Sequence, residues 1–159
     1  MRIITLIFLL TLYSCNEPVS KENKGEIEQT ESKSSAEQVA LEFINDYVDF
    51  CNDQNSELNL IEWISKQTKV TENFKFQLIK IMSEAEKQDP ELGLGFDPIF
   101  NAQDYPENGF ELEKAEKESE FIHVKGKNWS DFRLKIKMEK KNKKWFVNGI
   151  GIINMPEYE

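Results

Sequence analysis

The chain has 159 residues, of which 31% are charged and 39% are hydrophobic, and its formal net charge is −9. This length allows one folded domain once the ends are trimmed. An acidic domain is repelled by phosphate groups, so nucleic acid and anionic lipid head groups are poor partners, whereas a basic protein or a neutral ligand fits the charge.

The N-terminus begins with Arg2 and an apolar run over residues 3–10. This run is too short to cross a bilayer core of about 30 Å as a helix, and it is typical of a signal peptide. Leu12-Tyr13-Ser14-Cys15 resembles a bacterial lipoprotein signal. The resemblance implies cleavage after residue 14, acylation of Cys15 and anchoring in the cell envelope. The outer membrane is the favoured site, with the domain on its periplasmic or surface side. An ordinary secretory signal that ends near a cysteine is the alternative.

Residues 16–34 are almost entirely polar and charged, with only Val19 and Ile27 apolar. Such a composition cannot offset the entropy of ordering the backbone, so we predict a disordered tether with a reach of about 25 Å. The domain organisation is then a signal peptide over residues 1–14, a lipidated cysteine and tether over 15–34, and a single domain over 35–159. Acylation of Cys15 leaves Cys51 without a disulfide partner.

Helical patterns fill the first half of the domain. Ser35 is predicted as an N-cap, with Gln38 as its capping-box partner. An i, i+3, i+4, i+7 stripe then predicts an amphipathic helix with a buried face. The residues of that stripe are Ala36, Val39, Ala40, Phe43, Ile44, Tyr47, Val48 and Cys51.

A short helix is predicted over residues 60–64, and Thr71 is predicted to cap a third helix. Phe74, Leu78, Ile81, Met82 and Ala85 form the apolar stripe of this third helix, and Phe76 and Ile79 fall outside it.

The hydrophobic period changes to two in the second half. Residues 132–139 alternate apolar and charged side chains, which predicts a half-buried strand. A lysine-rich turn over 140–144 and a returning strand over 145–153 follow it. Two further strands are predicted over 110–116 and 121–125, with the acidic side of the first opposite the basic side of its neighbours. Helices followed by an antiparallel sheet of about four strands predict an α+β fold.

Residues 92–106 join the two halves and are rich in Gly, Pro, Asp and aromatic residues. Within them, Gly95-Phe96-Asp97-Pro98 followed by Gln103-Asp104 resembles the signature of domain of unknown function 3828, a family of small bacterial envelope proteins. Residues 144–150 are similar to the last long strand of the nuclear-transport-factor-2-like superfamily. The resemblance implies a cone-shaped domain with helices packed on a curved sheet. That superfamily includes enzymes, carriers and interaction modules, so the fold gives no function.

Chemistry-bearing residues are few. His123 has no second His or free Cys in a recognisable motif, which argues against zinc and Cys-His catalysis, and no cofactor or metal is predicted. Asp97, Asp104 and Tyr105 are candidates for acid–base chemistry, with Gln103 in the same loop. The alternative, which we favour, is that the aspartates bind loop backbone.

Two functions are therefore compatible with the sequence. The first, which we favour, is a membrane-anchored lipoprotein with a non-catalytic domain that binds a protein or small ligand, as an accessory or immunity-type protein does. The second is a small hydrolase, dehydratase or isomerase that uses Asp97, Asp104 and Tyr105.

Overall fold

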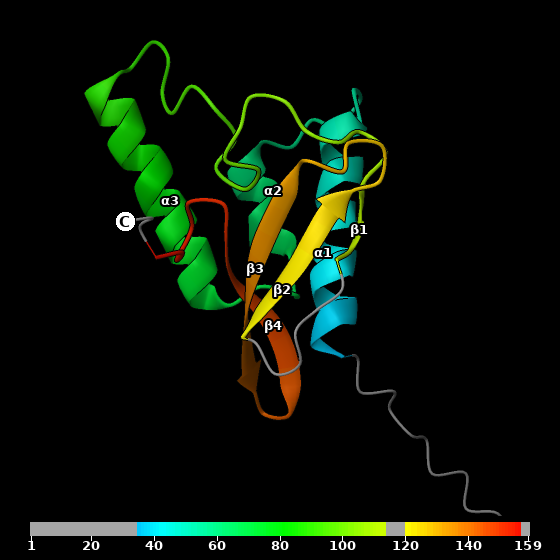
Figure 1. Cartoon of the computed structure of the whole chain (residues 1–159). Helices are drawn as coiled ribbons and strands as arrows, with labels where there is room; N and C mark the ends of the chain where they lie inside the picture. Colours follow the sequence, from blue (N-terminus) through cyan, green and yellow to red (C-terminus); the bar gives the residue numbers. More distant parts are fainter. Residues whose placement is uncertain (1–34, 114–119, 157–159) are drawn as a thin grey trace, which may run out of the picture. The chain divides into compact units, whose positions relative to one another are not determined.

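Three helices precede a four-stranded antiparallel sheet, which confirms the predicted α+β fold (Figure 1). The computed structural model describes residues 35–113 and 120–156. The helices are α1 (Ala36–Asn52), α2 (Leu60–Lys66) and α3 (Glu72–Gln88). The strands are β1 (Phe110–Leu112), β2 (Phe121–Gly126), β3 (Arg133–Lys141) and β4 (Lys144–Ile150), in the spatial order β1-β2-β3-β4. The predicted signal peptide, Cys15, the tether and residues 114–116 of the first predicted strand lie outside the described residues.

Helix α1 forms as predicted and packs its apolar stripe against all four strands. Ser35 Oγ accepts a hydrogen bond from the Gln38 N–H at 3.1 Å, so the predicted N-cap is confirmed. The Gln38 side chain donates to Glu42 instead of closing a capping box. Cys51 is half-buried rather than enclosed, because it lies in the last turn, where α1 reaches the surface.

Helix α2 differs from the prediction at its end, whereas α3 has the predicted ends. Helix α2 has a complete capping box between Asn59 and Glu62, which the sequence reading missed, and it continues to Lys66. Thr71 caps α3 as predicted. In α3 only Phe74 and Leu78 are fully buried, because the helix continues past the core, and the exposed fraction of Phe76 reaches 63%.

Opposite charges pair across the edge of the sheet. In the β1–β2 register Glu111 lies opposite Lys125, and their side chains are 3.3 Å apart. Glu113 Oε1 lies 3.0 Å from Arg133 Nε on β3. The predicted complementarity between the acidic and basic strands is confirmed.

The β3–β4 hairpin is tighter than predicted. Lys140 and Lys141 continue β3 and pair with Trp145 and Lys144, so the five-residue turn over 140–144 is wrong. Asn142 and Lys143 alone make the turn, with φ of 50° and 65°. Two left-handed residues match the twist of the flanking strands, which allows the shortest possible connection.

Strand β4 ends at Ile150, three residues before the predicted end. Gly151 follows with φ of 59°, and its α-carbon lies against residues 98–99: a Cβ there would be 2.2 Å from the Pro98 carbonyl oxygen. The Ile152 N–H donates to the same oxygen at 3.0 Å. The chain therefore leaves the sheet because it packs on the segment that joins helices and strands.

Candidate functional site

The joining segment is fixed by Asp97. Its Oδ1 accepts hydrogen bonds from the Ile99 and Phe100 N–H groups, each at 2.8 Å. Its Oδ2 accepts a hydrogen bond from the hydroxyl of Tyr47, a residue of α1 that is only 1% exposed. Both oxygens are therefore used within the fold, as expected for an aspartate that holds loop backbone.

Burial controls the protonation of this group. It raises the pKa of Asp97 above its ordinary value of 3.8, against the bonds from Tyr47 and the two amides, which lower it. Burial and the neighbouring Asp97 carboxylate raise the pKa of Tyr47. Burial also raises the pKa of the nearby Cys51 thiol to about 11, which leaves it protonated and unreactive near neutral pH.

The other predicted residues make no hydrogen bond to the Asp97 side chain. Asp104 is exposed and makes no hydrogen bond to any described residue, so it does not hold loop backbone there as predicted. Gln103 donates to the Gly95 carbonyl at 3.2 Å. The Tyr105 ring stacks on Phe100 with centroids 4.7 Å apart, and its hydroxyl donates to Asn52 Oδ1 at 3.0 Å. Asp97, Asp104 and Tyr105 thus have different hydrogen-bond partners and do not form the acid–base cluster that the enzyme alternative requires.

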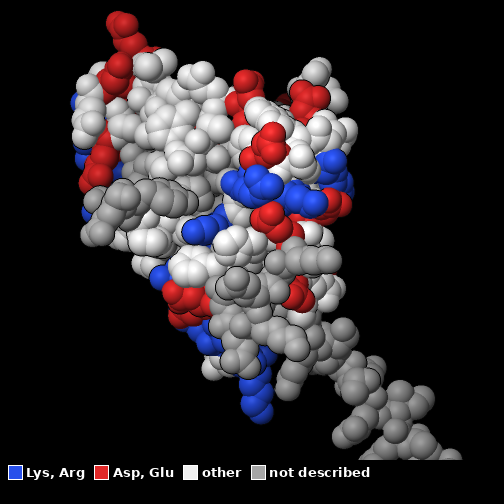
Figure 2. Space-filling view, in the orientation of Figure 1, with Lys and Arg blue, Asp and Glu red and all other residues white. Residues whose placement is uncertain are grey.

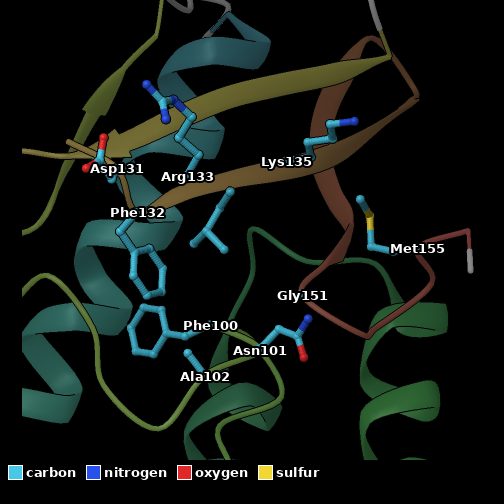
Figure 3. Close-up of a pocket in the computed structure, with 10 residues that line it drawn as sticks. Phe100, Asn101, Ala102, Asp131, Phe132, Arg133, Lys135, Gly151 and Met155 are labelled. Atoms are coloured by element: carbon cyan, nitrogen blue, oxygen red, sulfur yellow. The ribbon is translucent and has the colours of Figure 1, made fainter. Parts of the chain in front are cut away.

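A cavity of about 280 Å³ lies beside the start of β3 (Figure 3). In Figure 3, Phe100 and Phe132 lie together on one side of β3, and Arg133 and Lys135 extend from its other side. Asp97, Asp104 and Tyr105 are not among the lining residues. These are Phe100, Asn101, Ala102, Asp131, Phe132, Arg133, Leu134, Lys135, Gly151 and Met155.

One wall of this cavity is a strand edge without a partner strand. Strand β4 pairs with β3 only from Ile136 onward, so residues 133–135 pair with β2 alone. The Gly126 N–H donates to Phe132 O, and the Met138 N–H donates to Glu120 O. The backbone N–H and C=O groups of the even-numbered residues of β3 therefore point toward β2. In an antiparallel ladder the alternate residues face the opposite way. The backbone polar groups of Arg133 and Lys135 therefore face the cavity.

The sequence reading missed both the cavity and the role of Tyr47. It placed Tyr47 correctly in the core of α1 but assigned no partner to its hydroxyl, although a buried tyrosine hydroxyl usually has one. No local signal marks the cavity, because its walls come from residues 100–102, 131–135, 151 and 155.

No family model matches the chain, and no curated protein or solved structure matches it. His123 is half-buried and lies opposite Lys135 in the β2–β3 register. Within residues 35–113 and 120–156, no three His, Cys, Asp or Glu side chains come together as a metal site would need.

The raised pKa of Asp97 predicts a pH-dependent stability. A carboxyl group whose pKa is raised by folding stabilises the fold below its unfolded pKa, and this contribution is lost as the pH rises through the folded value. The amide that Asp97→Asn introduces does not titrate. The free energy of unfolding of the wild type, relative to Asp97→Asn, should therefore fall as the pH rises above about 4 in urea titrations.

The substitution Asp104→Asn removes one carboxylate from an exposed position of the same segment and is the matched control. A wild-type advantage over Asp97→Asn that grows with pH, or an equal fall in the Asp104→Asn comparison, would contradict this assignment.

Proposed function

We propose that the chain is a bacterial envelope lipoprotein, anchored through acylated Cys15, whose domain binds a partner and catalyses no reaction. The signal-like residues 1–14 and the polar segment 16–34 support the anchor. Within the described part of the chain, every helix is too short or too polar to cross a bilayer. The outer membrane is the proposed location, with the domain on its periplasmic or surface side.

The observation that carries the non-catalytic assignment is the bonding of Asp97. A general base must lie where a substrate can reach it. Both oxygens of Asp97 accept bonds from the protein, and Asp97 does not line the cavity. Asp104 is exposed to solvent, and Tyr105 is stacked on Phe100. An enzyme built on these three residues would require them to converge on one substrate.

The cavity beside β3 is the proposed binding site. Its lining includes Phe100 and Phe132, and the surface that it exposes is mostly polar, with hydrogen-bonding groups at a strand edge. An unpaired edge also offers main-chain hydrogen bonds to an extended peptide. The proposed kinship is with the domain of unknown function 3828 family and the nuclear-transport-factor-2-like superfamily, supported by the motif residues Gly95 to Pro98 and the helix-then-sheet order.

The anchor is tested by replacing its thiol. In cells grown with a labelled fatty acid, Cys15→Ala should abolish labelling and leave the precursor uncleaved or the protein soluble, since no thiol remains to be acylated. Cys51→Ala is the matched control and should label like the wild type, because Cys51 lies on the apolar stripe of α1 within the folded domain. Unchanged labelling and membrane partition of Cys15→Ala would contradict the lipoprotein assignment.

The binding site is tested by photo-crosslinking in intact cells. A photoreactive phenylalanine derivative placed at Asp131 or Lys135, both exposed and both at the cavity, should give a discrete adduct that contains the bound partner. The same derivative at Lys66, exposed on α2 and away from the cavity, is the control and should give none. Adducts from Lys66 alone, or no adduct from either cavity position, would contradict the site.

A further inference from the structure

Positive charge is concentrated in one hairpin of this acidic protein. Seven of the 20 Lys and Arg residues lie between Arg133 and Lys144, together with only one of the 29 Asp and Glu residues, Glu139. The rest of the chain is therefore more acidic than the net charge of −9 suggests. A charge separation of this kind gives a protein a preferred orientation in the field of a charged surface.

Four of these lysines surround the β3–β4 turn, and all four are exposed: Lys140, Lys141, Lys143 and Lys144. Lys141 lies 3.0 Å from Glu139, and Lys140 lies 5.0 Å from the ring centroid of Trp145. Lys143 and Lys144 make no ion pair with any described residue. In Figure 2 the lowest coloured atoms of the domain are blue, where Figure 1 has this turn.

One of these lysines occupies a backbone position that favours glycine. Both central residues have positive φ, and glycine is the preferred residue at the second of these positions because it has no Cβ. Lys143 occupies that position with φ of 65°. A lysine there is less favourable for the backbone conformation than glycine and adds a positive charge to the exposed turn.

The lysine turn lies at the same end of the domain as Ser35, where the tether joins. The carbonyl of Lys69 accepts from the Val147 N–H of β4 at 2.8 Å, and Lys69 Nζ lies 2.6 Å from Asp46 of α1. The middle of α1 is therefore level with the middle of β4. The last turn of α1 lies at the opposite end of the sheet, where the Asn52 side chain donates to the Glu107 carbonyl just before β1, so the first turn of α1 points toward the hairpin (Figure 1).

We propose that the lysines of this turn bind anionic phospholipid head groups and orient the domain with the hairpin toward the membrane. This inference rests on the proposed anchor, because a tether from Cys15 to Ser35 with a reach of about 25 Å keeps this end of the domain near the bilayer. Lysines attract anionic head groups within a Debye length of the surface, and the acidic remainder of the domain is repelled. The net negative charge of the protein disfavours its binding to anionic lipids. The lysine turn is the exception, because positive charge is concentrated there.

The test uses the chain from Asn16 onward, without the acylated cysteine. Among the residues that the structure describes, every buried core residue lies between Val39 and Ile153, so this chain retains that core. At low ionic strength it should sediment with phosphatidylcholine vesicles that contain about one third phosphatidylglycerol and should not sediment with pure phosphatidylcholine. Replacing Lys140, Lys141, Lys143 and Lys144 by Gln should weaken partition by about fivefold per lysine.

The matched control replaces Lys66, Lys80, Lys87 and Lys127 by Gln. These four lysines are also exposed, and the net charge changes by the same amount. The control should bind like the wild type, and circular dichroism should show that both variants are folded.

Equal losses in the two variants, undiminished binding of the hairpin variant, or no binding of the wild type to anionic vesicles would overturn the proposal. The last result would leave an acidic protein as the partner of the turn. Because the test needs no acyl chain, its failure is separate from failure of fatty-acid labelling at Cys15.

Discussion

The bonding of Asp97 holds the two halves of the domain together. Its carboxylate takes the Tyr47 hydroxyl from the buried face of α1 and two backbone N–H groups from the segment that leads to the sheet. That segment then presents the Pro98 carbonyl to Gly151 and Ile152, where β4 ends. The Asp97 side chain thus connects the first helix with the irregular segment, and the backbone of that segment contacts the end of the last strand.

The cavity follows from the same constraint. Because the chain turns away at Gly151, β4 never pairs with residues 133–135, and the edge of β3 remains open beside Phe100 and Ala102. The open edge and the lysine turn lie at opposite ends of β3. The domain therefore separates two surfaces, one suited to main-chain and apolar contacts and one suited to anionic head groups. With the hairpin toward the membrane, as proposed, the open edge would lie at the end of β3 farther from the membrane.

Periodic patterns predicted much of this fold. The stripe of α1 and the alternation along β3 depend only on local spacing, and both elements form where that spacing places them. The end of β4 was mispredicted because it depends on a contact with distant residues, that of Gly151 with Pro98. Asp97 was correctly identified as a loop-holding residue, but its bond to Tyr47 joins positions 50 residues apart. Asp104 has the same residue type in the same segment, and only the fold shows that it faces solvent.

The central claim, that Asp97 is structural, is tested most directly by the unfolding free energies of two alanine variants in urea. Asp97→Ala leaves the Ile99 and Phe100 N–H groups without their acceptor and should lower the unfolding free energy by about 1–3 kcal/mol for each donor that stays buried. Asp97→Asn should recover part of this loss, and Asp104→Ala should stay within about 0.5 kcal/mol of the wild type. An Asp97→Ala variant as stable as the wild type would contradict the account and would favour a functional carboxylate, whose removal is often neutral or stabilising.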